Sequence, residues 1–152
     1  MPTSIDAGMK PPFKFSARTR VGFSDTDAQG IVFNGNYATY IDDTVTDYFD
    51  AIGLPWDAFT RSGHDMVLAR TETDFRSAGR LGETLVTGAR VTRIGKTSVV
   101  FALRTWEESS ARVVIEARLI QVVVDHSTLQ PRPVPDFFIE AVERAQGEAV
   151  ER

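Results

Sequence analysis

One amphipathic segment, followed by a long succession of strand-like segments, constrains the fold most. Apolar side chains recur at helical spacing over residues 37–52, namely Tyr37, Ile41, Val45, Tyr48, Phe49 and Ile52. The opposite face of this segment is acidic and polar, and Gly53 follows where a helix would end. A long helix with a single apolar face must cover another surface, and a β-sheet is the simplest surface available.

The other patterns are typical of β-strands. A loose alternation predicts one strand over residues 13–23, before the helix. Four further strands are predicted after the helix, over residues 66–75, 84–94, 97–107 and 113–124. Gly95-Lys96 is the signal of a tight hairpin, and residues 56–62 and 137–147 have the pattern of short helices.

This order predicts an α+β protein in which a five-stranded antiparallel sheet packs on one long helix, with a short C-terminal helix. We expect a flexible lead-in over residues 1–12, a single domain over residues 13–147 and a tail over residues 148–152. One helix cannot cover both faces of such a sheet. Pairing of two copies that extends the sheet would cover the remaining edge and apolar surface.

Composition excludes several classes of function. The 152 residues suit one domain, and the net charge of -4 provides no basic field for nucleic acid or an anionic membrane. The absence of cysteine excludes disulfides, thiolate metal sites and a cysteine nucleophile. His64 and His126 lack neighbouring ligands, so we expect surface histidines and no metal. The absence of cysteine also fits a cytoplasmic protein. Residues 1–12 lack the apolar centre of a signal peptide, and no apolar run approaches the length of a membrane span.

The residues with chemical potential are concentrated in segment 21–37. A strand-like run ends in Asp25 and Asp27, a turn follows at Gly30, and Asn34 precedes the helix. This order places a carboxylate opposite the amide-rich start of a helix. A carboxylate can attack or deprotonate, and helix-start N–H groups can hold the negative charge that develops on an acyl oxygen. The segment therefore predicts acyl-transfer chemistry.

The same segment carries a family resemblance. Asp25-Thr26-Asp27-x-x-Gly30-x-Val32, followed by Asn36-Tyr37 and the helix, resembles the hotdog-fold acyl-CoA thioesterases, above all the 4-hydroxybenzoyl-CoA thioesterase type. The order of elements matches over nearly the whole chain. The resemblance implies a curved antiparallel sheet wrapped around the long helix, and hydrolysis of an acyl-CoA thioester to the free acid and CoA. It also implies a homodimer with active sites at the interface. We expect no cofactor and a homotetramer made of two dimers, although the residues leave the choice between dimer and tetramer open.

The resemblance assigns roles within the motif. In that family the second acid is the catalytic carboxylate, which matches Asp27. The residue seven positions later donates its backbone N–H to the thioester oxygen, which matches Asn34. Related proteins have Tyr or His there, so Asn34 is a departure that nevertheless keeps the backbone donor. Asp25 is expected to cap or order the loop. The residues do not choose between attack by Asp27 on the carbonyl carbon and activation of water by Asp27.

Substrate contacts are predicted around the motif, on one strand and beside one hairpin. The predicted set is Gly30, Val32, Phe33, Tyr37, Thr71, Glu72, Thr73, Arg93 and Lys96. Arg93 and Lys96 flank the predicted hairpin, where related proteins hold basic residues against CoA phosphates. The bound partner is therefore expected to be an acyl-CoA substrate, with neither a nucleic acid nor a membrane as a partner.

Two other functions compete with hydrolysis. A hotdog dehydratase or hydratase acting on acyl thioesters would need a histidine beside the acid, and no histidine lies between Ser24 and Gly63. A non-catalytic module that binds acyl thioesters is favoured by the missing Tyr or His at Asn34, and disfavoured by the presence of Asp27. The residues leave open whether the acyl group is aromatic or aliphatic, and whether its carrier is CoA or acyl carrier protein.

Overall fold

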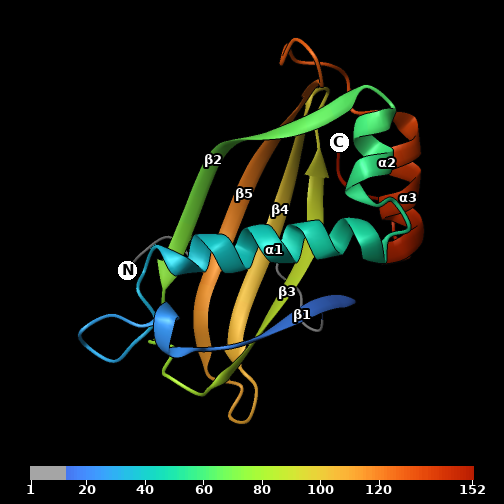
Figure 1. The fold of residues 1–152 in the computed structure, drawn as a ribbon. Helices are drawn as coiled ribbons and strands as arrows, with labels where there is room; N and C mark the ends of the chain where they lie inside the picture. The colour runs from blue at the N-terminus through green and yellow to red at the C-terminus, as the bar shows by residue number, and fades with distance from the viewer. Residues whose placement is uncertain (1–12) are drawn as a thin grey trace.

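The computed structural model describes residues 13–152, so the predicted lead-in lies outside the described residues. The elements in chain order are β1 (Phe15–Arg20), a short 3-10 helix η1 (Phe23–Asp25), α1 (Asn36–Ala51), α2 (Trp56–Arg61), β2 (His64–Phe75), β3 (Thr84–Ile94), β4 (Ser98–Glu107), β5 (Val113–Asp125) and α3 (Asp136–Gln146). The strands form one five-stranded sheet in the order β1-β3-β4-β5-β2 (Figure 1). All neighbouring strands are antiparallel.

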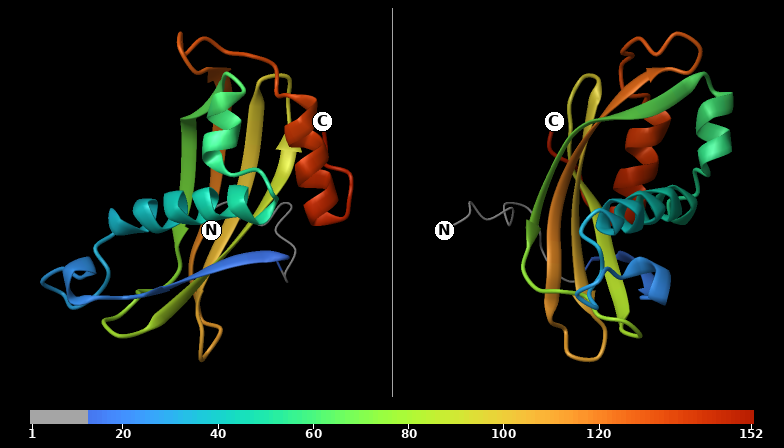
Figure 2. Two further views of the ribbon diagram at one scale, coloured as in Figure 1. Left: turned by 45° about the vertical axis from the view of Figure 1, so that its right-hand side comes forward. Right: turned by 60° about the vertical axis from the view of Figure 1, so that its left-hand side comes forward.

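Helix α1 lies across the concave face of the curved sheet, and α2 and α3 lie on the same side of the sheet (Figure 2). The face of α1 that meets the sheet is buried: Tyr37, Tyr40, Ile41, Thr44, Val45, Tyr48 and Phe49. The Tyr48 ring meets the edge of Phe101 on β4 and of Phe15 on β1, each at a centroid distance of 5.7 Å. Burial of each large apolar side chain stabilises the fold by roughly 1.5–3 kcal/mol. The predicted fold class is confirmed.

The C-terminal end of α1 is anchored in an aromatic cluster. The chain leaves the helix at Gly53, whose φ of +78° is a left-handed conformation that favours glycine. The Phe49 ring then packs against Trp56, Phe59 and Phe138, with centroid distances of 5.0, 5.6 and 5.7 Å. Helices α2 and α3 are thereby joined to α1 by side-chain packing.

The expectation that His64 is a surface residue is wrong. His64 is the first residue of β2 and only 9% exposed, with its ring against Phe59 and Phe137. Gly63 has a φ of +87°, a left-handed conformation that favours glycine. The side chain of the next residue enters the aromatic cluster. His126 is exposed, as predicted.

Most predicted boundaries agree with the structure within two residues, but the first strand is shorter than predicted. β1 ends at Arg20, and Phe23–Asp25 then form one turn of 3-10 helix. The Val21 N–H donates to the Glu83 carbonyl at 2.9 Å, which holds the chain as it leaves the sheet. No helix within residues 13–152 has both the length and the apolar character needed to cross a membrane.

Candidate active site

A small hairpin follows η1 and carries the predicted catalytic acid. Thr26 pairs with Val32 in antiparallel fashion, and the Asp27 N–H donates to the Ile31 carbonyl at 2.9 Å. The Gly30 N–H donates back to the Asp27 carbonyl at 3.0 Å, and Gly30 has a φ of +73°. The glycine therefore closes a tight turn that begins at Asp27.

The two acids of the motif have different surroundings. The Asp25 carboxylate accepts the Gly22 N–H at 2.8 Å, so Asp25 orders the loop as predicted. The Asp27 carboxylate accepts the Gln29 N–H through Oδ1 at 2.8 Å and is half-buried. Among the described residues no group donates to Asp27 Oδ2. One oxygen of Asp27 is thus held in place while the other is available to a ligand.

Two hydrogen bonds to one carbonyl fasten this hairpin to the start of α1. The Asp25 carbonyl accepts the Phe33 N–H at 2.9 Å and the Asn36 side-chain amide at 2.7 Å. The Asn36 N–H in turn donates to the Phe33 carbonyl at 2.8 Å. Asn36 was expected only as part of the motif. Its side chain sets the position of the acid-bearing loop relative to the helix.

The helix start presents uncommitted backbone donors. Gly35 is the N-cap of α1 and Asn34 precedes it, and both residues are exposed. In the part of the chain that the structure describes, neither N–H donates a hydrogen bond. A Cβ on Gly35 would lie 2.8 Å from the Phe33 ring, so the absence of a side chain lets that ring pack here. The first N–H groups of a helix, with the positive end of its dipole, attract developing negative charge.

The remaining predicted residues of the motif divide into exposed and buried groups. Gly30 and Phe33 are exposed, and Phe33 retains 52% of its accessible surface. Val32 and Tyr37 are buried in the core. The Tyr37 hydroxyl accepts the Gly79 N–H at 3.0 Å, and burial raises the pKa of Tyr37. Within one chain, Val32 and Tyr37 therefore lie in the core beneath the candidate site and are not exposed in it.

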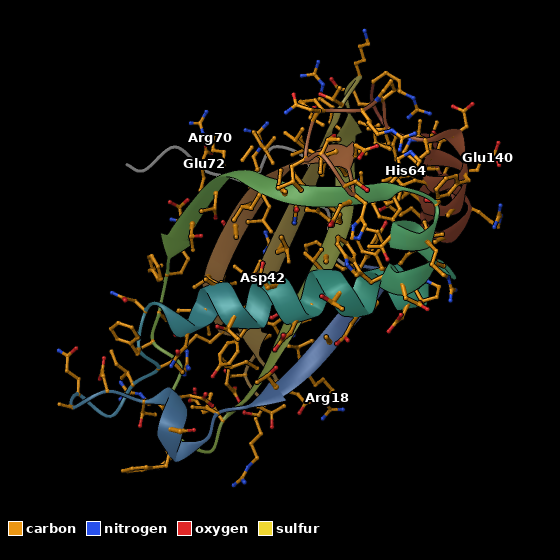
Figure 3. The ribbon with its side chains drawn as sticks, turned by 45° about the horizontal axis from the view of Figure 1, so that its top comes forward. Arg18, Asp42, His64, Arg70, Glu72 and Glu140 are labelled. Atoms are coloured by element: carbon orange, nitrogen blue, oxygen red, sulfur yellow. The ribbon has the colours of Figure 1, made fainter. Side chains whose placement is uncertain are left out.

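The end of β2 approaches the helix start. The Phe75 ring lies 5.9 Å from the Tyr37 ring, and Thr71, Glu72 and Thr73 precede Phe75 on the same edge strand. Glu72 forms an ion pair with Arg70 at 2.6 Å on the exposed side of β2 (Figure 3). Large apolar side chains stand exposed on the segments that meet here: Phe23, Phe33, Phe75 and Leu81.

Arg93 and Lys96 lie at the other end of the sheet. The Lys96 carbonyl accepts the Val134 N–H at 2.8 Å, and Arg93 pairs with Glu151 near the C-terminus. Arg93 is nine residues from Thr84 along β3, which is about 30 Å in a strand that rises roughly 3.3 Å a residue. One chain therefore does not bring these cations to Asp27, and a shared site would need a second chain.

Sequence reasoning missed Tyr40, which lies one helical turn after Asn36. Its side chain is 6% exposed, and its hydroxyl is buried close to the Asp25 carboxylate. Burial and the nearby Asp25 carboxylate raise the pKa of Tyr40. The apolar face predicted from the helical spacing did not include Tyr40, and no pattern in the sequence indicates its proximity to Asp25. No group of three potential ligands for a metal ion occurs among these residues.

Comparison with known proteins assigns this chain to a family. The model of the thioesterase superfamily matches residues 29–114, which is more than half of the chain. The chain belongs to the thioesterase superfamily. The family-level prediction of a thioesterase is thus confirmed, while the match begins two residues after Asp27 and does not test that residue.

Individual proteins resemble this thioesterase-superfamily chain in sequence or in fold. It is 25% identical over 120 residues to the acyl-CoA thioester hydrolase YbgC of Escherichia coli, covering 79% of this chain and 89% of that protein. A 1,4-dihydroxy-2-naphthoyl-CoA thioesterase from Synechocystis has a TM-score of 0.77 at 17% identity, over 84% of this chain and 94% of that one. A thioesterase-superfamily protein from Jannaschia has a TM-score of 0.82 at 18% identity, over 89% and 94%. These structures share the hotdog fold.

Proposed function

We propose that this protein hydrolyses acyl-CoA thioesters to the free acid and CoA, with Asp27 as the catalytic carboxylate. The backbone N–H groups of Asn34 and Gly35 would hold the oxyanion. The observation that carries the proposal is a pair of exposed N–H groups at the start of the 16-residue helix α1 that donate no hydrogen bond within residues 13–152. The neighbouring hairpin bears the Asp27 carboxylate, of which Oδ1 accepts the Gln29 N–H. The relative named acyl-CoA thioester hydrolase supports the same reaction.

Two reaction courses use these groups. In the first, an Asp27 oxygen attacks the thioester carbon, CoA leaves as a thiol after protonation, and water cleaves the mixed anhydride to regenerate the carboxylate. In the second, Asp27 takes a proton from water as the water oxygen attacks the same carbon. The C–S bond then breaks, and the proton held by Asp27 passes to the leaving CoA thiolate, which restores the carboxylate. Both courses put negative charge on the acyl oxygen, and N–H donors at a helix start stabilise that charge.

The acyl group would lie against the exposed apolar side chains near the helix start. Phe33 and Phe75, 52% and 58% exposed, would supply apolar contact, with Gly30 leaving room for the chain of the substrate. Thr71, Glu72 and Thr73 offer polar groups on the neighbouring edge strand. The buried Val32 and Tyr37 would act indirectly by fixing the shape of the site. We infer a cytoplasmic location from the proposed CoA substrate and the absence of cysteine.

We also propose that the protein forms a homodimer along β2, and that two dimers form a tetramer. β2 is an edge strand, and Val67, Leu68 and Phe75 on it are 39%, 50% and 58% exposed. An edge strand with exposed apolar side chains favours pairing with another chain. A partner chain would also bring Arg93 and Lys96 within reach of a CoA bound near Asp27.

Replacement of the acid tests the catalytic assignment. Asp27→Asn preserves shape and should lower kcat for the best acyl-CoA by at least about 100-fold, with little change in KM or in urea unfolding. Asp25→Asn is the matched control in the same loop, and we expect a smaller loss of rate. Release of free thiol from a panel of acyl-CoAs gives the rates. Wild-type turnover by purified Asp27→Asn would remove Asp27 from the mechanism.

Sedimentation tests the assembly. At micromolar concentration the wild type should have the mass of four chains of 16.8 kDa, and the mass of two chains would support the dimer without the tetramer. Leu68→Lys, on the edge strand, should shift the mass toward one chain and lower activity. Arg18→Ala on the opposite edge strand β1 is the control and should change neither. A fully active single chain would contradict the proposed interface.

A further inference from the structure

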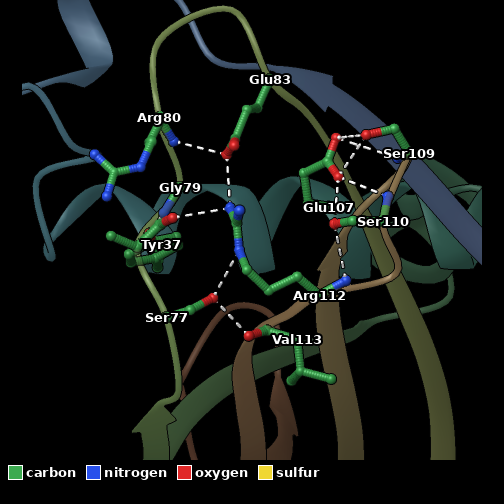
Figure 4. A network of polar contacts seen from close by, with 11 residues as sticks. Tyr37, Ser77, Gly79, Arg80, Glu83, Glu107, Ser109, Ser110, Arg112 and Val113 are labelled. Carbon is green, nitrogen blue, oxygen red and sulfur yellow. Dashed lines mark hydrogen bonds and ion pairs between the residues drawn. The ribbon is translucent and has the colours of Figure 1, made fainter.

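Arg112 reaches from the turn before β5 into the loop that joins β2 to β3. Its Nε donates to the Ser77 hydroxyl at 3.1 Å, and its Nη2 donates to the Ala78 carbonyl at 3.0 Å. The same Nη2 forms an ion pair with the Glu83 carboxylate at 2.8 Å (Figure 4). One guanidinium therefore binds both ends of the loop formed by residues 76–83.

Further hydrogen bonds make this loop a closed structure. The Ser77 hydroxyl donates to the Val113 carbonyl at 2.7 Å, which ties the loop to β5. The Glu83 carboxylate accepts the Arg80 N–H at 2.9 Å as well as Arg112. A planar guanidinium offers donors in fixed directions and can satisfy several acceptors at once, whereas a lysine ammonium is a single flexible point.

The far side of the loop holds both parts of the candidate active site. The Gly79 carbonyl accepts the Val32 N–H at 2.8 Å, and the Gly79 N–H donates to the Tyr37 hydroxyl at 3.0 Å. Ile31 also pairs with Arg80 as an isolated bridge. A Cβ on Gly79 would lie 3.1 Å from the Val32 side chain, so a larger residue at this position would have to displace its neighbours. The loop thus contacts the hairpin that begins at Asp27 and the first turn of α1.

We propose that Arg112 is a positioning residue for thioester hydrolysis, acting through Gly79 on the relative placement of Asp27 and the helix-start donors. The inference rests on the proposed function. Arg112 itself contacts neither group. Its contribution is geometric: a displacement of about 1 Å between a reacting group and its partners can cost on the order of 100-fold in rate. Arg112 joins segments that are 29 to 35 residues away in sequence, so it holds together parts that local structure alone would not.

The test combines hydrogen exchange with kinetics in the full chain. Arg112→Ala should raise amide exchange at least about tenfold in residues 76–83 and in residues 26–37, because the bonds from Arg112 no longer oppose local opening. Its kcat should fall at least tenfold while KM changes less. Arg112→Lys keeps the charge toward Glu83 and should give intermediate exchange and intermediate kcat. Ser109→Ala is the matched control and should leave both measurements unchanged, since Ser109 lies in the same turn and, among residues 13–152, donates only to Glu107.

The outcomes separate this inference from the proposed function. Faster exchange in both segments together with the loss of kcat, graded from wild type through Lys to Ala, supports the positioning role. Unchanged exchange in residues 26–37, or a normal kcat despite faster exchange there, overturns it. If Arg112→Ala does not fold, the same criteria apply to Arg112→Lys. Failure of the proposed function is detected separately, by full activity of Asp27→Asn in the same assay.

Discussion

The two ends of helix α1 are built in opposite ways. At its C-terminal end Phe49 is fully buried among aromatic rings, and the Gly53 and Leu54 N–H groups donate to Asp50 and Phe49 carbonyls. At its N-terminal end Asn34 and Gly35 are exposed, and their N–H groups donate no hydrogen bond to any residue within 13–152. Packing and satisfied hydrogen bonds stabilise the first end, whereas the second is the end that we propose binds the thioester. A rigid anchor at one end of the helix allows the other end to remain incompletely bonded.

The largest effect should follow from damage to the anchored end. Phe59 is fully buried and contacts Phe49, Trp56 and Phe138. Phe59→Ala should lower the free energy of unfolding by about 3–5 kcal/mol through lost burial and a cavity. Urea unfolding measures this loss, and Phe23→Ala, at an 83% exposed ring, is the control with little change. The folded fraction of Phe59→Ala should keep its kcat, and a large loss there would show that the two ends are not separable.

The next effect concerns a single donor at the N-terminal end. Asn34→Pro deletes the backbone N–H and should lower kcat about 100- to 1000-fold, as expected for the loss of one oxyanion donor. Asn34→Ala keeps the N–H and should cost only a few-fold. Circular dichroism and the mass of the assembly must show that the proline variant is folded. Normal turnover by a folded Asn34→Pro protein would leave the helix start without an oxyanion role.

Local sequence patterns predicted the anchored helix and the sheet well. The helical spacing from Tyr37 to Ile52 and the stop at Gly53 match α1, and the segment predicted over residues 84–94 is β3 itself. The motif also directed attention to the hairpin around Asp27 because its turn depends on a glycine at Gly30. Each of these signals lies within one element and reflects burial periodicity or a backbone conformation.

Contacts between distant segments were beyond those patterns. The bond between Tyr37 and Gly79 joins residues 42 apart, and no local feature of either one indicates the other. His64 followed a glycine in an apparent loop, yet three-dimensional packing placed it in the aromatic cluster. The position of the helix start could be predicted from the sequence, but the long-range contacts that fix its position in the fold could not.

A smaller effect is expected far from both ends of α1. Arg93→Glu and Lys96→Glu should raise KM for acyl-CoA several-fold with little change in kcat, because a phosphate contact remote from the carbonyl contributes mainly uniform binding. Higher salt should shrink the effect through screening. Short thioesters that lack the nucleotide are the control and should be nearly insensitive. Equal losses on both kinds of substrate would show that these cations do not bind the CoA phosphates.

The smallest effect is a pH dependence of stability that belongs to the anchored end. Burial, and then the positive charge of Arg132, hold the pKa of His64 below its usual range. The unfolded chain, with a histidine pKa near 6.5, therefore binds a proton first as pH falls. It follows that the free energy of unfolding should decrease as pH falls below about 6.5, by at most about 1.4 kcal/mol per pH unit from one such group.

Urea unfolding between pH 5 and pH 8 separates this contribution from other titrations. His64→Gln should flatten the slope on the acid side, whereas His126→Gln, at an exposed imidazole, is the matched control. The mutation should leave the activity of the folded protein at pH 8 unchanged, because His64 lies at the aromatic cluster and the proposed chemistry uses the other end of α1. An unaltered slope in His64→Gln would mean that protonation is tolerated inside the cluster. A loss of kcat at pH 8 would instead show that a change at the C-terminal end of α1 alters the helix start. We do not expect this, because the aromatic cluster and the proposed oxyanion donors lie at opposite ends of α1.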